Sequence, residues 1–153
     1  MVVLETDDSP VTWLKKDTKN MAKSKPKQAA DLARSIWRLR GSCENCGRKP
    51  PYQLHGAHIL GVGAHIRVCA DLRNGFCLCS SCHRRFEDNS FDFVEFVNGS
   101  WAAKYMKTLR RLARPGGPKI DWDDKLDQLK AIKKAMLAGE MTIEEAREYE
   151  IDN

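Results

Sequence analysis

Four cysteines in two Cys-x2-Cys pairs are the residues of this chain whose spacing points most directly to chemistry. The pairs are Cys43/Cys46 and Cys79/Cys82. Four thiolates separated in this way are typical of a tetrahedral zinc site. The alternative is a pair of disulfides in a secreted domain, but the N-terminus has no long apolar run of the kind found in signal peptides. Because a reducing compartment favours metal over disulfides, we expect a structural Zn²⁺ ion bound by these four residues.

Three further polar residues lie between the cysteine pairs or directly beside them, in the order His58, Asn74, His83. An imidazole has the right pKa to take a proton from water near neutral pH, so His58 is the candidate general base. His83 follows Cys82 at the start of an expected helix, where it could hold a catalytic divalent ion. Two plainer interpretations stay open: Asn74 with Gly75 is also a turn signal, and His83 is also a possible zinc ligand.

The segments that carry these residues resemble the HNH endonucleases. The resemblance is found at residues 55–60, 71–74 and 78–86. It implies a ββα-metal fold, hydrolysis of DNA phosphodiester bonds, and one catalytic divalent ion. It also implies that the side chain of Asn74 hydrogen-bonds backbone near His58 and fixes the imidazole ring. Asn74 would then position the base rather than react.

Other segments look like the small phage-encoded HNH proteins, a group that includes recombination nucleases of the NinG type. These segments are residues 13–16, 37–43 and 74–79. The resemblance implies a role in phage or prophage recombination, replication or packaging. The short helical extensions leave little room for a recognition region, so we expect low sequence specificity or selectivity for DNA structure.

One departure from the family concerns the catalytic metal. Many HNH enzymes place an acid or a histidine directly before the base, whereas this chain has Ala57. Glu87 follows His83 by four residues and would share its helix face, which makes it a candidate ligand. His55 precedes His58 by three residues, so a regular strand would point it to the opposite face unless Gly56 bends the chain. With water and phosphate completing the coordination shell, Mg²⁺ or Mn²⁺ is expected.

Charge is distributed unevenly along the chain. Residues 1–120 contain 21 Lys and Arg against 11 Asp and Glu, whereas residues 121–153 contain 5 against 10. A basic surface around a small metal site suggests a polyanion partner, with DNA, duplex or branched, the leading one. Arg84 and Arg85 beside His83, together with Arg67, are the expected phosphate contacts, although Arg84 and Arg85 could also be ordinary solvated helix charges.

The pattern of apolar residues predicts an α+β fold, a small zinc-stabilised, treble-clef-like ββα-metal core with flanking helices. Helices are expected at 28–40, from about 80, after 90, over 101–113, and along an apolar stripe beginning at Trp122. Trp37 is expected to flank the buried stripe of the first helix. The expected organisation is a basic N-terminal extension, a nuclease domain and an acidic helical extension, at residues 1–25, 26–115 and 116–153.

Two function classes fit these observations. The first is a divalent-metal-dependent DNA endonuclease, and the alternative is a non-catalytic zinc module that binds nucleic acid. The ordered His58, Asn74 and His83 favour the enzyme, since a binding module does not need them. Without an apolar stretch long enough to span a bilayer, we expect a cytoplasmic protein with no membrane partner. The oligomeric state is left open, with a dimer possible.

Overall fold

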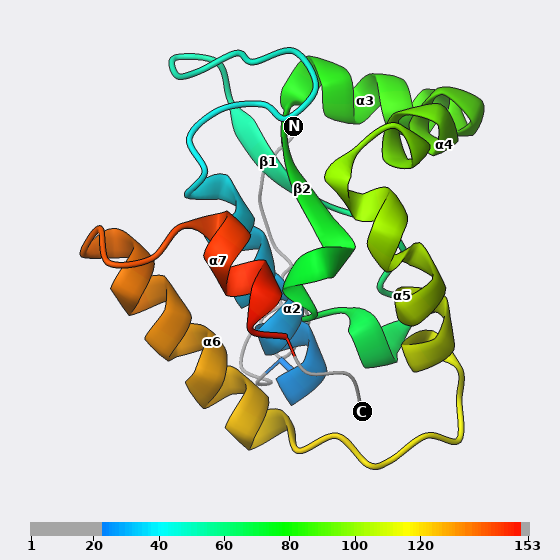
Figure 1. The fold of residues 1–153 in the computed structure, drawn as a ribbon, viewed down its shortest axis with the longest axis vertical. Coiled ribbons are helices and arrows are strands. Elements are labelled where there is room, and N and C mark those ends of the chain that lie inside the picture. The colour runs from blue at the N-terminus through cyan, green and yellow to red at the C-terminus, as the bar shows by residue number, and fades with distance from the viewer. Residues whose placement is uncertain (1–22, 151–153) are drawn as a thin grey trace, which may run out of the picture.

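A computed structural model describes residues 23–150 and places a two-stranded sheet among helices (Figure 1). The expected N-terminal extension, 1–25, therefore lies almost entirely outside the described residues. In the described part of the chain, no helix is long and apolar enough to cross a membrane.

The sheet and the helix that follows it form a ββα unit, which confirms the predicted α+β class. Strand β1 (Leu54–His58) pairs antiparallel with β2 (Gly75–Cys79), and α3 (Ser80–Asp88) follows β2 directly. The register sets Leu54 opposite Cys79 and His58 opposite Gly75. The candidate base thus ends its strand beside the segment that carries Asn74.

Helix α2 (Lys25–Arg38) lies directly on this sheet because two strand glycines allow a close approach. A Cβ atom at Gly56 would lie 2.6 Å from the backbone of Arg34, and one at Gly75 would lie 2.3 Å from the ring of Trp37. The helix begins and ends near its expected bounds, with the side chain of Ser24 as its N-terminal cap. Any larger side chain at either glycine would push α2 away from the strands.

Trp37 lies inside the buried cluster of α2, whereas the sequence predicted that it would lie at the edge of the buried stripe. The stripe runs through Ala29, Ala30, Ala33 and Ile36, and Trp37 is itself fully buried in that cluster. Its indole Nε1–H donates to the carbonyl oxygen of Leu72 at 3.0 Å. The aromatic ring can be buried there because its polar atom has a partner.

A second apolar cluster lies on the other side of the sheet and is covered by the helices that follow α3. These are α4 (Ser90–Asn98), the 3-10 helix η3 (Trp101–Tyr105) and α5 (Met106–Ala113). Phe76 of β2 meets Phe96 at a ring-centroid distance of 4.7 Å and Trp101 at 5.1 Å. The sheet is therefore packed on both faces.

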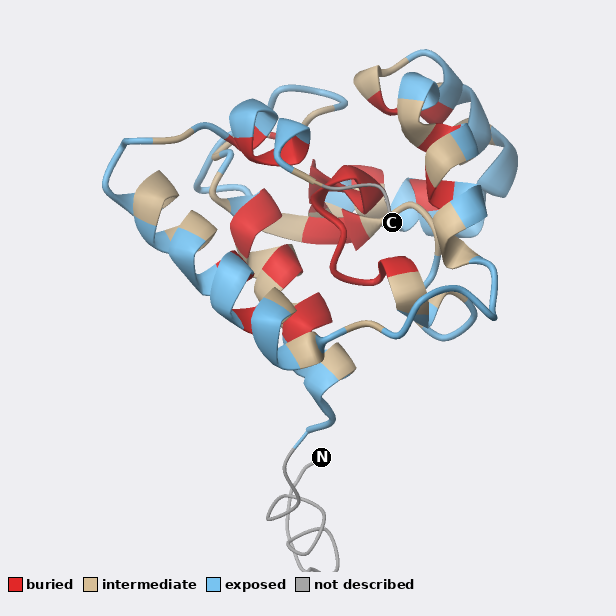
Figure 2. Ribbon diagram, turned by 60° about the horizontal axis from the view of Figure 1, so that its bottom comes forward, coloured by how far each residue is buried: buried red, intermediate tan, exposed pale blue. Residues whose placement is uncertain are grey.

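The acidic C-terminal region completes the first cluster. Helix α6 (Trp122–Leu137) packs against α2 and buries Leu126 and Leu129, so its apolar stripe has its partner within the chain. Helix α7 (Ile143–Glu148) begins with a capping box, a reciprocal pair of hydrogen bonds between Thr142 and Glu145. Figure 2 shows the helices with buried inner faces and exposed outer faces.

Arg147 of α7 connects this region to the sheet and to the cysteine segment. Its guanidinium donates to the carbonyl oxygens of Leu72 at 3.2 Å and Gly75 at 3.0 Å, and pairs with the buried Glu44 carboxylate at 3.3 Å. It also lies 3.8 Å from the ring centroid of Trp101. Residues more than 70 positions apart thus share one buried polar network.

Candidate active site and metal centres

The four cysteines of the two pairs come together as their spacing predicts. Their Sγ atoms all lie within 4.8 Å of one another, with Cys46 and Cys79 at 3.7 Å. Zn–S bonds of about 2.3 Å in a tetrahedron require sulfur atoms about 3.8 Å apart. Three of the thiols are buried, and none is in a disulfide. Donor type and spacing therefore fit a zinc ion.

Local backbone geometry shapes the first cysteine pair into a turn. Gly47 has φ of +80° and donates its N–H to the carbonyl oxygen of Cys43 at 2.9 Å. The N–H of Cys43 in turn donates to the carbonyl oxygen of Arg48 at 2.8 Å. Across the cluster, the side-chain amide of Asn45 donates to the sulfur of Cys82 at 3.3 Å. Hydrogen bonds to sulfur stabilise the thiolate form that binds metal.

His58 is held at the end of β1 by contacts with two neighbouring segments. Its ring packs edge-on against Trp37 with centroids 4.9 Å apart, and its Nε2 lies 2.7 Å from the carbonyl oxygen of Cys69. Because a carbonyl oxygen only accepts, this contact places the proton on Nε2 and the basic lone pair on Nδ1. Burial lowers the pKa of His58 to about 4, so the imidazole is neutral at pH 7.

Asn74 is fully buried and fixes the loop that leaves β1. Its side-chain amide donates to the carbonyl oxygens of Leu60 and Val68 at 3.1 and 3.0 Å, and its Oδ1 accepts from the N–H of Leu60 at 2.8 Å. The backbone contact near His58 that the resemblance implies is therefore present. All of these bonds are to backbone atoms of Leu60 and Val68, and a role of Asn74 in positioning His58 stays a prediction.

His83, in the first turn of α3, faces two other candidate ligands. Its Nδ1 lies 2.9 Å from Nδ1 of His55, and its Nε2 lies 3.7 Å from Oε2 of Glu87. Burial is the main cause that lowers the pKa of His83, against the opposing effect of Glu87. His55 reaches His83 on the strand face opposite to His58, so the alternation of the strand suffices and no bend at Gly56 is required.

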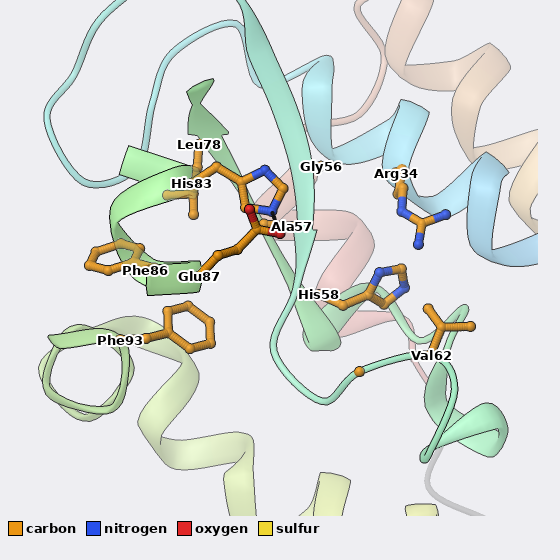
Figure 3. Close-up of a pocket in the computed structure, with 11 residues that line it drawn as sticks. Arg34, Gly56, Ala57, His58, Val62, Leu78, His83, Phe86, Glu87 and Phe93 are labelled. Carbon is orange, nitrogen blue, oxygen red and sulfur yellow. Dashed lines mark ion pairs between the residues drawn. The ribbon is translucent and has the colours of Figure 1, made fainter. Parts of the chain in front are cut away.

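His58 and His83 line a single pocket of about 380 Å³ from two sides of β1. Figure 3 shows His58 with Arg34 on one side of the strand and His83 with Glu87 on the other. Phe86 and Phe93 form an apolar wall beside His83. The pocket therefore combines a neutral imidazole, a second imidazole with a carboxylate, and a cation.

Sequence reasoning did not identify Arg34 as part of this pocket. The residue lies on α2 and pairs with Asp31 at 2.7 Å, while the close approach at Gly56 brings it beside β1. Its place in an ordinary amphipathic helix gives no local signal. Only the packing of α2 on the sheet identifies it.

The three arginines expected to contact phosphate lie elsewhere. Arg84 and Arg85 are exposed on α3 and are not among the residues that line the pocket. Nε of Arg85 lies 3.5 Å from Oδ2 of Asp92. Arg67 is half-buried and donates to the carbonyl oxygen of Leu112 at 3.1 Å, in a different hollow of the surface. Contact of these side chains with DNA stays a prediction.

Comparison with known proteins agrees with the geometry. Residues 43–94, about a third of the chain, match the family model HNH_2, described as HNH endonuclease. The matched stretch contains all four clustered cysteines and the residues His58, Asn74, His83 and Glu87. It supports the HNH family and implies metal-dependent nuclease activity. Searches of curated proteins and of solved structures gave no match.

Proposed function

We propose that the protein is a metal-dependent DNA endonuclease whose active site is the pocket shared by His58 and His83. The observation that carries the proposal is this shared pocket, in a stretch that matches HNH endonucleases. Two imidazoles with different partners, converging on one open hollow, can divide proton transfer and metal binding between them. A module that only binds nucleic acid has no use for this arrangement.

The residues that would hold the catalytic ion are His55 and His83. Metal–nitrogen bonds of about 2.1 Å at a right angle separate the two nitrogens by about 3.0 Å. The Nδ1 atoms of the two rings lie 2.9 Å apart, which fits this requirement. Glu87 lies near the other nitrogen of His83, where its carboxylate would orient the ring. His55 then supplies the donor that Ala57 cannot.

A divalent ion at this position would supply positive charge to the phosphate oxygens and to the leaving oxygen. The protein supplies the remaining functions. Nδ1 of His58 accepts a proton from the attacking water, while its Nε2–H remains bonded to the carbonyl oxygen of Cys69. Arg34 contributes a cation that can bind phosphate on the His58 side of the pocket.

Two imidazole donors make the site softer than one built mainly on oxygen. We therefore expect Mn²⁺ to bind more tightly than Mg²⁺, with both activating cleavage. Excess Zn²⁺ should inhibit, because it would occupy the histidines with higher affinity. The finer assignment, action with low sequence specificity on duplex or branched DNA in phage recombination, replication or packaging, rests on the resemblance to small phage proteins.

Replacing His58 tests the proposal directly. His58→Ala should lower the cleavage rate by roughly 10²-fold or more, the range typical for loss of a general base, with little change in DNA affinity. His65→Ala is the matched control, because His65 lies in the loop that follows His58 and does not line the pocket. Labelled duplex, single-stranded and four-way-junction DNA would be tested with Mn²⁺, Mg²⁺ or EDTA. A wild-type protein that binds DNA but never cuts it would support the non-catalytic zinc module instead.

A further inference from the structure

Helix α5 carries basic residues along its outward face. We call this set the α5 stripe: Lys107, Arg110, Arg111 and Arg114. Their spacing of three and four residues places Lys107, Arg110 and Arg111 on one side of the helix, and Arg114 is the C-cap residue that follows its last turn. All four are exposed, whereas Met106 and Leu109 on the opposite side are buried in the core. The stripe therefore faces solvent.

No acidic residue lies near the α5 stripe along the chain. Residues 96–120 contain no Asp or Glu. Within residues 23–150, no carboxylate forms an ion pair with Lys107, Arg110 or Arg114. The helix dipole favours cations only near the C-terminal end, so it does not account for Lys107 in the first turn. Since like charges at this spacing destabilise a helix, the stripe suits an external anionic partner.

The stripe is joined to the active-site pocket by the loop between the two strands. Early residues of that loop, Gly61 and Val62, line the pocket. Later in the same loop, the 3-10 helix η1 (Ile66–Val68) packs against α5, and Arg67 bonds to the carbonyl oxygen of Leu112. The stripe itself lies outside the pocket, so its partner must extend beyond the reacting phosphate.

We propose that the α5 stripe is a second contact surface for the DNA backbone, an inference that rests on the proposed nuclease function. From Lys107 to Arg114 the helix rises by about 10 Å. Each strand of B-DNA presents one phosphate per about 3.4 Å of axis, so the stripe matches about three phosphates. Phosphate contacts position DNA without reading its sequence. The stripe thus holds duplex DNA with sequence-independent affinity.

Charge reversal on the stripe tests this inference by binding rather than by cleavage. The test variant is Lys107→Glu/Arg110→Glu/Arg114→Glu in the zinc-loaded full chain without activating metal. The control, Lys130→Glu/Lys133→Glu/Lys134→Glu on α6, changes net charge by the same amount. Fluorescence anisotropy with several unrelated duplexes would give Kd between about 50 and 200 mM salt. Circular dichroism and zinc content would verify folding, and the triple Gln variant of the stripe is the milder alternative.

We expect the stripe variant to bind every duplex at least roughly tenfold more weakly, with a salt slope lower by about three, one for each lost phosphate contact. The α6 control should change far less. Equal weakening in the two variants would overturn the stripe proposal while leaving the nuclease intact. A wild-type chain that neither binds nor cuts DNA would refute the proposed function itself. Binding to anionic vesicles in preference to duplex would also overturn the inference.

Discussion

The two candidate metal centres of this molecule differ in how completely the protein encloses them. The cysteine cluster offers four identical donors, three of them buried, whose sulfur atoms all lie within 4.8 Å of one another. The histidine site offers the Nδ1 atoms of His55 and His83, 2.9 Å apart, beside the open pocket that His83 lines. A closed set of ligands is suited to stabilising a fold, and an open set leaves positions for water and substrate.

The two centres are nevertheless adjacent in the chain. Cys82 belongs to the closed cluster and His83, the next residue, belongs to the open pocket. Cys79 is the N-cap residue of the same helix. The closed cluster therefore fixes the helix turn that presents His83, and the geometry of the open centre depends on it.

Removing one cysteine should have the largest effect. Cys79→Ser should release zinc and abolish cooperative folding, because metal binding supplies much of the folding free energy in small zinc domains. Metal analysis and thermal unfolding followed by circular dichroism would measure both changes. Cys77→Ser is the control, since Cys77 is buried in the same strand outside the cluster. Retention of zinc and of a cooperative transition in Cys79→Ser would show that the cluster is not structural.

Removing the histidine that follows the cluster should separate the two centres. His83→Ala should abolish metal-stimulated cleavage and weaken Mn²⁺ binding while the structural zinc stays, because the four cysteines complete that site without it. His55→Ala should weaken Mn²⁺ binding in the same way. Isothermal titration with Mn²⁺ and zinc analysis of each variant are the measurements. Loss of zinc from His83→Ala would place this residue in the structural centre instead.

Arg147→Ala should destabilise the fold by about 3–5 kcal/mol, because it leaves the carboxylate of Glu44 buried without its cation. Glu44 lies in the cysteine turn, so the change tests how far that centre depends on the C-terminal helix. The matched control is Arg40→Ala, which breaks an ion pair to Glu144 of α7 whose carboxylate is largely exposed. A surface pair contributes about 1 kcal/mol or less. Equal urea-unfolding midpoints of the two variants would contradict the prediction that the buried pair of Arg147 and Glu44 contributes more to stability than the surface pair.

The smallest effect concerns the pH dependence of stability. Unfolded His58 has an ordinary pKa near 6.5, whereas burial lowers the folded pKa to about 4. As the pH falls from 7 to 5, the unfolded chain binds a proton that the folded chain does not, so folding loses about 2 kcal/mol. His58→Gln should lose less stability over this range. Urea unfolding of both proteins at pH 7 and 5 would detect the difference, and identical losses would show that His58 is not buried as a neutral ring.

Local patterns in the sequence predicted most of the elements and the four-cysteine cluster. The cysteine pairs and the order of His58, Asn74 and His83 can be found in the linear sequence, because they are characteristic residue types at characteristic spacings. Periodicity also identified the apolar stripe of α6, but it could not identify α2 as the partner. Packing between two helices about 100 residues apart cannot be recognised from local patterns in a single sequence.

The features that escaped prediction all depend on such distant contacts. Arg34 lines the pocket because α2 packs on β1 at Gly56, and Trp37 is central because Gly75 makes room for its ring. In the sequence, Arg147 resembles a solvent-exposed charged residue of a short helix, yet in the structure it is buried and pairs with Glu44. The direction of His55 toward His83 required the strand register, which the glycine-rich sequence did not define.

The position of Arg147 near the end of the described chain has a consequence for synthesis. During synthesis, the two cysteine pairs, His55 and His83 are made well before residue 147. The nascent chain therefore contains every proposed metal ligand while Glu44 still lacks its cation. The backbone carbonyl oxygens of Leu72 and Gly75, which accept hydrogen bonds from the same guanidinium, also lack their donor until residue 147 has been synthesised. A messenger RNA truncated within the α6 coding region would therefore produce a chain that contains the cysteines and histidines of both metal centres but lacks Arg147, the buried partner of Glu44.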